Sequence, residues 1–286
     1  MKDKIEGIII KNISNLYTID TKEGLYDCKP RGKFYVQNLT PMVGDKVVID
    51  KNNNYILEIK ERKNYLMRPF IANVDICIVV TSVKEPDLSL FLLDKLLCLK
   101  ISNKIKPIIC FTKVDLLSKE EKEEFNKIYE YYNKIGIDAI VNTDLERLDT
   151  LIKGATVVLT GQSGAGKSSL LNKLNPELEL NTSEISKALG RGVHTTRHTE
   201  TFKYKNAFIS DTPGFSSLDL NILTKEDIKN AFIEFGNNCY FKDCYHINET
   251  KCEVKDNIGI NIMKSRYDNY VKLVNEVGNK RIIYKK

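Results

Sequence analysis

The sequence predicts a multidomain α/β protein, and three regional patterns support that prediction. Residues 1–64 hold short apolar runs separated by turn residues, as in a small β-barrel. From residue 73, longer apolar runs alternate between strand-like and helix-like periodicity, which is typical of a doubly wound parallel sheet. Near the C-terminus, three cysteines and a histidine crowd together. At 286 residues the chain is long enough for three domains, expected at 1–64, 65–222 and 223–286.

Five short strands are expected in the N-terminal domain. Glycines and the run Asn52–Asn54 separate them, and five strands fit an OB-type barrel, whose face commonly binds oligonucleotides. Another small barrel, or a structural cap without a ligand, fits the same pattern. The expected strands are 7–10, 16–19, 33–36, 46–49 and 55–59.

The middle domain begins with an alternation of buried strands and helices. Val74–Val80 and Pro107–Phe111 are expected to be strands, because they are short runs made up almost wholly of apolar residues. Leu88–Ile101 and Lys119–Gly136 are expected to be helices, the second with a solvated face rich in lysine and glutamate. Helical connections between strands imply parallel pairing, and therefore a doubly wound sheet.

A complete phosphate-loop motif, G-x-x-x-x-G-K-[ST], spans Gly161–Ser168 and lies between a strand-like run, Ala155–Leu159, and a helix-like run. In such a loop, backbone N–H groups cradle phosphate, Lys167 reaches the β- and γ-phosphates, and the Ser168 hydroxyl holds Mg²⁺. The alternative is a glycine-rich turn that binds nothing, and the flanking strand and helix argue against it. The candidate GTP contacts in this segment are Gly161, Gln162, Ser163, Gly164, Ala165, Gly166, Lys167, Ser168 and Ser169.

The segment Thr112–Asp115 indicates which base is bound. It follows a strand-like run and is similar to the N-K-x-D guanine box, with Thr112 in place of the usual asparagine. The Asp115 carboxylate would accept hydrogen bonds from the ring N–H and the exocyclic amine of guanine, a donor pair that adenine lacks. Without the phosphate loop, a strand ending in a solvated turn would explain the segment equally well. The candidate GTP contacts here are Thr112, Lys113, Val114 and Asp115.

A third box, Asp211–Gly214, follows another strand-like run. Asp211 is expected to hold Mg²⁺ through water, and the Gly214 N–H to contact the γ-phosphate, so that this segment responds to nucleotide state. The guanine segment precedes the phosphate loop, whereas ordinary guanine-nucleotide switch proteins have the reverse order. The sequence therefore predicts a circularly permuted P-loop GTPase.

The polar, glycine-rich stretch Gly190–Thr196 has the position of a first switch loop, with Thr195 or Thr196 supplying a hydroxyl to Mg²⁺. After the third box stands Phe215, where many GTPases carry a glutamine that positions the attacking water. An aromatic ring cannot position water, so another group must do so. His194 is the catalytic candidate, and the alternative is a solvated loop histidine.

The cysteine distribution predicts a metal centre. Cys239, Cys244, His246 and Cys252 offer three thiolates and one imidazole within 14 residues, enough for one closed tetrahedral zinc site. Four protein ligands leave no position for water, so the expected role of the ion is structural. One alternative is that the four residues lie close together by coincidence. Another is a disulfide between two of the cysteines, with no role for the other two residues, but disulfides are rare in the reducing cytosol.

Together these motifs resemble the circularly permuted ribosome-associated GTPases of bacteria, the RsgA (YjeQ/YloQ) family. The resemblance covers nearly the whole chain and includes Gly44–Val47, Arg62–Pro69 and the predicted first switch. It implies hydrolysis of GTP to GDP and phosphate, stimulated by the small ribosomal subunit during its late maturation. It also implies contact with 16S rRNA and a role for the switch histidine, which corresponds to His194.

The charge distribution agrees with an RNA partner. Residues 1–64 hold 12 Lys and Arg against 9 Asp and Glu, and residues 240–286 hold 10 against 6. Both flanks are therefore basic, although solvated faces give the same small excess. In the amphipathic stretch near the C-terminus, Arg266 and Tyr267 either stack on RNA or belong to the core.

The chain begins without a signal-peptide stretch, and no apolar run approaches the roughly 20 residues of a membrane helix. We therefore expect a cytoplasmic monomer with no membrane contact. Two other functional classes remain open. One is a nucleic-acid-binding module that nucleotide merely stabilises. The other is an ATP-dependent enzyme such as a P-loop kinase, and the guanine segment argues against it.

Overall fold

The computed structural model describes residues 3–37, 39–67, 70–176, 200–211, 220, 223–236 and 238–278. The chain divides into two compact units. The first unit comprises Met1–Ile78 and Leu145–Ser216, and the second comprises Val79–Asp144 and Ser217–Lys286. No helix in the described part of the chain has the length and apolar character needed to cross a bilayer.

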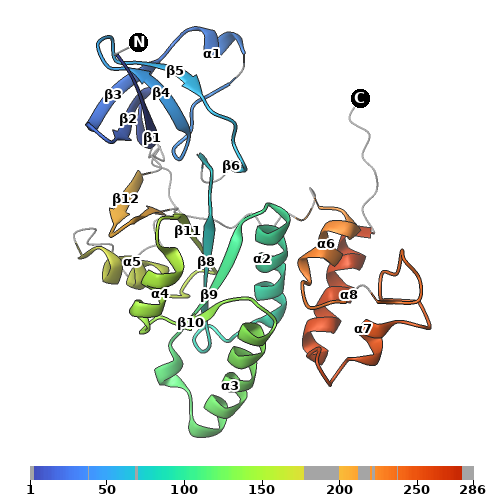
Figure 1. Cartoon of the computed structure of the whole chain (residues 1–286). Helices are drawn as coiled ribbons and strands as arrows, with labels where there is room; N and C mark the ends of the chain where they lie inside the picture. Colours follow the sequence, from blue (N-terminus) through green and yellow to red (C-terminus); the bar gives the residue numbers. More distant parts are fainter. Residues whose placement is uncertain are drawn as a thin grey trace, which may run out of the picture. The chain divides into compact units, whose positions relative to one another are not determined.

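The first unit begins with a closed five-stranded barrel (Figure 1), as the sequence predicts. The strands pair in the order β1-β2-β3-β5-β4, and β1 also pairs with β4, which closes the sheet on itself. Strands β3 and β5 pair in parallel and the other neighbours are antiparallel, so the barrel is of the OB type. Inward-facing isoleucine and valine side chains fill its core. The strands are β1 (Lys4–Ile13), β2 (Leu16–Thr21), β3 (Gly24–Pro30), β4 (Lys46–Asp50) and β5 (Tyr55–Ile59).

One strand prediction is wrong. Lys33–Val36 forms the short helix α1, and the third strand is β3, Gly24–Pro30, where the sequence predicted no strand. The interior positions of β3 are Tyr26, Cys28 and Pro30, which give only a weak apolar alternation. The aromatic residues of 33–36 suggested a strand. Phe34 is indeed buried, at 3% exposed, but it lies in a helical turn.

Gly44 and its neighbours join the barrel to the hairpin of β6 (Tyr65–Met67) and β7 (Phe70–Ala72). Gly44 has φ of +86°, its N–H donates to the Ile9 carbonyl at 2.7 Å, and its carbonyl accepts from Asn73 Nδ2 at 3.0 Å. The Cβ of any other residue would lie 2.1 Å from the Ala72 carbonyl oxygen. This position therefore requires glycine.

The next residue, Asp45, is fully buried and paired with Arg62. Arg62 donates from Nε and a terminal nitrogen to the two carboxylate oxygens, each at 2.7 Å, and Asp45 also accepts from the Met42 N–H at 2.7 Å. Charge-assisted bidentate pairs of this kind fix geometry as well as add stability. The two segments that resemble the family's N-terminal module and its junction thus meet in one hydrogen-bonded cluster.

The remainder of the first unit is a sheet with helices α4 (Leu145–Ile152) and α5 (Lys167–Leu174). Strand β11 (Thr156–Thr160) pairs in parallel with β13 (Ala207–Asp211), and β12 (Glu200–Tyr204) pairs antiparallel with β13. Strand β12 also pairs with barrel strand β1, where Glu200 lies opposite Lys11. The barrel and this sheet are therefore continuous through main-chain pairing.

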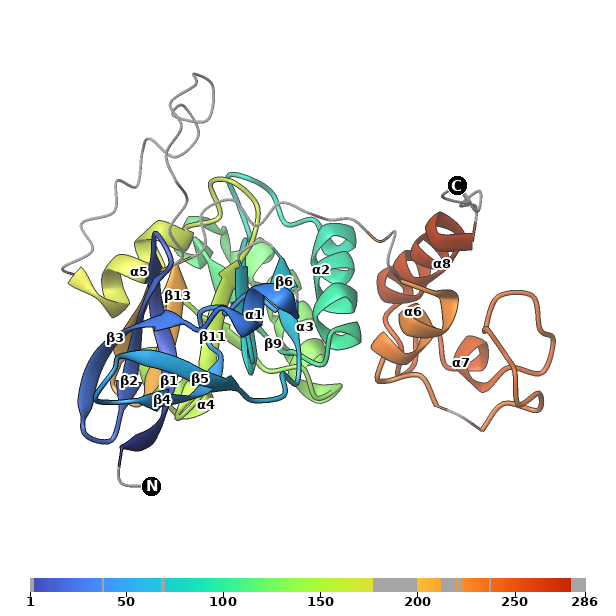
Figure 2. The same ribbon diagram turned by 90° about the horizontal axis from the view of Figure 1, so that it is seen from above.

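The second unit contains the strand order β10-β9-β8, with β9 and β10 parallel. Every residue of strand β8 is buried, including the polar Thr81 and Ser82 at its end, and its first three residues belong to the first unit. Helices α2, α6 and α8 pack against one another (Figure 2), and their core includes Phe232, Tyr270 and Leu273. The bounds are β8 (Ile76–Ser82), α2 (Leu90–Ser102), β9 (Lys106–Thr112), α3 (Lys119–Lys134), β10 (Ala139–Val141), α6 (Lys225–Ala231), α7 (Glu253–Asp256) and α8 (Lys264–Gly278).

A buried ionic network joins α2 and α3 to the C-terminal helices. Arg266 of α8, 1% exposed, donates to the Asp94 carboxylate of α2 at 2.6 Å and to Glu234 at 2.8 Å. Asn269 and the Tyr132 hydroxyl also donate to Asp94, each at 2.7 Å. Arg266 thus belongs to the core, which rejects the alternative that it stacks on RNA.

We predict that Gly44→Ala is strongly destabilising. The new methyl group would clash with the Ala72 carbonyl in a backbone conformation that alanine disfavours, so the free energy of unfolding should fall by about 3 kcal/mol. Urea unfolding followed by circular dichroism measures this change. Gly32→Ala is the control, since nothing lies within 4 Å of its added Cβ. Equal midpoints for the two variants would contradict the prediction.

We predict that Arg266→Met lowers the free energy of unfolding by about 3–5 kcal/mol, because it leaves the Asp94 carboxylate buried without a cation. Adding Asp94→Leu should restore part of the stability by removing the orphaned charge. Glu276→Gln is the matched control. It removes the more exposed Lys95–Glu276 pair between the same two helices and should cost no more than about 1 kcal/mol. A similar small loss for Arg266→Met would refute the prediction.

Candidate nucleotide loops and metal centre

The phosphate-loop motif lies where the sequence predicts, between β11 and α5 of the first unit. Three of its glycines have positive φ, +150° at Gly161, +76° at Gly164 and +89° at Gly166. Side chains disfavour these conformations, which explains why the motif repeats glycine. Gly166 is the N-cap of α5, so the first turn of that helix presents its free N–H groups beside the loop.

Lys167, the first residue of α5, points back over the loop. Its Nζ donates to the Gly161 carbonyl at 2.8 Å and to the Gln162 carbonyl at 2.7 Å. Burial lowers the pKa of this ammonium from its ordinary value. A phosphate in the loop would reverse that effect, because a nearby anion favours the charged form of lysine. The geometry is therefore that of a loop shaped for an anion.

The guanine-type segment lies in the second unit, at the C-terminal end of β9. Thr112 is 2% exposed as the last residue of that strand, and its carbonyl accepts from the Val83 N–H at 3.1 Å. Lys113 has φ of +60° and its Nζ donates to the Glu85 carbonyl. Asp115 follows in a single 3-10 turn, Val114–Leu116, with its side chain exposed to solvent. The segment thus ends a parallel strand, as a base-binding loop of a doubly wound sheet does.

The predicted switch residues are described only in part. Asp211 is the last residue of β13, and its backbone alone is described. His194, Thr195, Thr196 and Gly214 lie outside the described residues. Their assignments therefore stay predictions.

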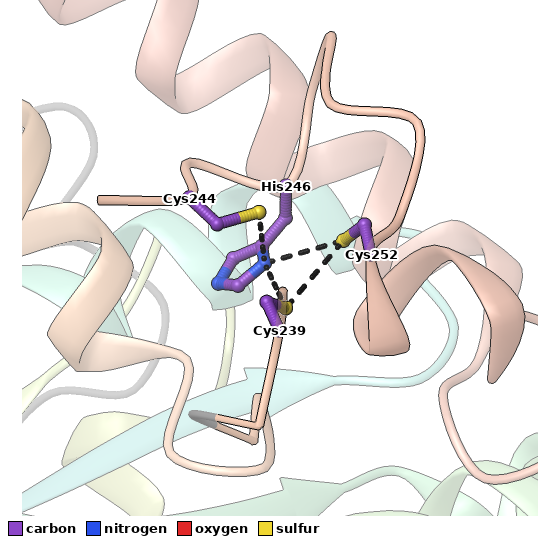
Figure 3. Close-up of side chains that lie close together, drawn as sticks. All are labelled: Cys239, Cys244, His246 and Cys252. Carbon is purple, nitrogen blue, oxygen red and sulfur yellow. Dashed lines mark hydrogen bonds between the residues drawn. The ribbon is translucent and has the colours of Figure 1, made fainter. Parts of the chain in front are cut away.

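The four predicted metal ligands come together in the second unit (Figure 3). Their four donor atoms all lie within 4.8 Å of one another. His246 Nδ1 lies 3.5 Å from Cys239 Sγ and 3.4 Å from the sulfur atoms of both Cys244 and Cys252. The Cys239 and Cys252 sulfurs are 3.9 Å apart, and all three cysteines are free, which rejects the disulfide alternative.

These distances fit a tetrahedral zinc ion. With Zn–S bonds of about 2.3 Å and a Zn–N bond of about 2.0 Å, the ligand separations become about 3.8 Å for S···S and about 3.5 Å for S···N. Burial raises the pKa of the Cys244 thiol to about 12 and raises that of Cys252 as well. A dication at the centre opposes this shift by stabilising the thiolates. The donor set and its spacing therefore fit zinc.

Tyrosine and glutamate side chains outside the ligand set hold the ligand loop in place. Tyr267 Oη donates to the His246 carbonyl at 2.7 Å, and Tyr270 Oη donates to the Tyr245 carbonyl at 2.6 Å. Glu249 accepts from two backbone N–H groups, at 2.7 and 2.9 Å. Tyr267 and Tyr270 are three residues apart on α8, a spacing that marks one helix face but does not reveal what that face contacts.

Two family models match the chain. The model for the RsgA GTPase matches residues 59–221, and that for the RsgA N-terminal domain matches residues 6–56. The first alone spans more than half of the chain.

Individual relatives and solved structures agree with these matches. The chain is 44% identical to the small ribosomal subunit biogenesis GTPase RsgA of Staphylococcus saprophyticus, over 97% of this chain and 99% of the relative. It is 42% identical to RsgA 1 of Listeria monocytogenes, over 98% and 100%. The crystal structure of YloQ, a circularly permuted GTPase, superposes with a TM-score of 0.84 at 34% identity, covering 98% of this chain and 97% of that one. YjeQ from Thermotoga maritima gives 0.85 at 35%, covering 97% and 100%. The chain belongs to the RsgA family of circularly permuted GTPases.

Proposed function

We propose that this GTPase binds the small ribosomal subunit, assists its late maturation and hydrolyses GTP to GDP and phosphate faster when bound there. The observation that carries this proposal is the near full-length similarity to proteins named for small ribosomal subunit biogenesis. The formed phosphate loop, with Lys167 turned over it, supports the nucleotide part. A cytoplasmic monomer fits this role.

Each predicted nucleotide contact has a proposed task. The backbone of Gly161–Gly166 and the Lys167 ammonium hold the phosphates, and Ser168 holds Mg²⁺. Asp115 selects guanine by accepting two hydrogen bonds from the base. Thr112, Lys113 and Val114 contact the nucleotide from the same segment. Ser169 adds a first-turn contact at the N-terminus of α5.

The switch residues complete the proposed site. Asp211 holds Mg²⁺ together with either Thr195 or Thr196, and Gly214 contacts the γ-phosphate. His194 takes the place of the missing glutamine and positions the attacking water. Because this histidine is the proposed water-positioning group, its removal should lower the stimulated rate more than nucleotide affinity.

The flanking segments are proposed to contact RNA. We assign 1–64 to an RNA-binding barrel, 65–222 to the permuted GTPase domain and 223–286 to a zinc-binding domain. The basic excess of both flanks favours 16S rRNA as the surface that they recognise. The closed OB-type strand order supports the barrel's part, because such barrels present loops and one sheet face to oligonucleotides.

We predict that the purified protein hydrolyses GTP slowly alone and much faster with small ribosomal subunits, with no stimulation of ATP hydrolysis. Ser168→Ala should abolish hydrolysis and GTP-dependent subunit binding, because it removes the hydroxyl that holds Mg²⁺. Phosphate release and cosedimentation with a non-hydrolysable GTP analogue measure both effects. Unchanged GTP-dependent binding by Ser168→Ala, or equal turnover of ATP, would argue against the proposal.

We propose one structural Zn²⁺ per chain at the Cys₃His centre, in addition to Mg²⁺ with bound GTP. Cys244→Ser should reduce the bound zinc well below one ion per chain and make the C-terminal segment sensitive to protease, because zinc binding contributes to folding there. Elemental analysis and limited proteolysis give the readouts. Cys98→Ala removes a buried cysteine outside the cluster and should keep the zinc. A wild-type protein purified without any zinc would contradict the assignment.

A further inference from the structure

Two aromatic rings on the metal-binding loop face solvent. Tyr240 is 70% exposed and Phe241 is 43% exposed, and their ring centroids lie 4.9 Å apart at 85°. Among the described residues of the segment 223–278, they are the exposed aromatic side chains, whereas Phe232, Phe235 and Tyr270 are buried. Exposing two large rings side by side loses the free energy that their burial would supply. Such a surface is typical of a binding site.

Cationic side chains accompany the rings. The Lys251 ammonium lies 4.7 Å from the centroid of the Tyr240 ring, and the exposed Lys242 directly follows Phe241. Asp243 is the acidic neighbour in this stretch, whereas the Glu249 carboxylate is occupied by backbone N–H donors. The surface therefore combines faces for stacking with ammonium groups that attract phosphate.

The rings stand on a loop of fixed shape. They lie between the ligands Cys239 and Cys244, the Phe241 carbonyl accepts from the Cys244 N–H at 3.3 Å, and the Tyr240 N–H donates to the Lys251 carbonyl at 3.4 Å. A loop fixed at both ends loses little conformational entropy on binding. The backbone that carries the rings is thus hydrogen-bonded on both sides of them.

We propose that Tyr240 and Phe241 form a stacking platform for unpaired RNA bases, with Lys242 and Lys251 contacting the adjacent phosphates. Aromatic rings beside lysines are how proteins bind single-stranded RNA, whereas a helical RNA keeps its bases stacked inside. This proposal deepens the proposed ribosomal function and rests on it for the identity of the RNA. It assigns single-stranded RNA, rather than duplex or ribosomal protein, to this loop.

The first test measures binding of the full-length, zinc-loaded protein to a fluorescein-labelled twelve-residue oligouridine by anisotropy. The double variant Tyr240→Ala, Phe241→Ala should weaken binding about tenfold or more, since each stacked base contributes substantially to affinity. Tyr240→Phe keeps a ring and should retain most of the affinity. Lys251→Ala should lower the slope of log affinity against log salt by about 0.7, as expected for one lost phosphate contact.

Two controls separate this effect from damage to the fold. Ile260→Ala removes an apolar side chain that is 74% exposed in the same segment and should leave oligouridine binding unchanged. Zinc content and basal GTP hydrolysis should be unchanged in every variant. A twelve-base-pair RNA duplex should bind the double variant and the wild type equally.

The outcomes distinguish this proposal from the proposed function. Unchanged oligouridine affinity in the double variant overturns the platform, even if small subunits still stimulate hydrolysis. Loss of small-subunit cosedimentation with unchanged oligouridine affinity also overturns it, because the rings would then contact a ribosomal protein. Failure of the wild type to respond to small subunits refutes the ribosomal function, whereas the oligouridine comparison still decides the stacking role.

Discussion

The second unit depends on the buried ion pair between Asp94 and Arg266. Both side chains are removed from water, which is costly unless every charge is matched. Here Glu234 accepts a hydrogen bond from Arg266, and Asn269 and Tyr132 donate hydrogen bonds to Asp94. A network of this kind accepts one arrangement of its helices, because any slippage leaves a charge without a partner. It therefore specifies how α8 packs on α2.

The Cys₃His cluster and this network both hold the C-terminal segment together. The segment is short, and small folds seldom bury enough apolar surface to be stable alone. The Cys₃His centre fixes the loops, while α6 and α8 share a core with Cys98 and Leu99 of α2. Tyr267 and Tyr270 connect the two parts, since both stand on α8 and both bind carbonyls of the ligand loop.

Much of the fold and site could be predicted where chemistry is local. The phosphate loop needs glycines with positive φ, and the metal ligands follow one another closely in the chain. Two features depend on the fold rather than on local sequence. The strand expected at 33–36 was wrong, because Phe34 is buried from a short helix. The choice between core and surface for Arg266 stayed open, because its burial depends on Asp94, which lies far away in the sequence.

Strand β12 begins at residue 200, directly after the segment that contains the predicted first switch. It pairs with β13 on one side and with barrel strand β1 on the other. Neighbouring strands of a sheet hydrogen-bond to one another and share its twist. The barrel is therefore joined to β13 by this pairing as well as by the chain itself. A change of orientation between barrel and sheet would have to bend or break the pairing of β1 with β12.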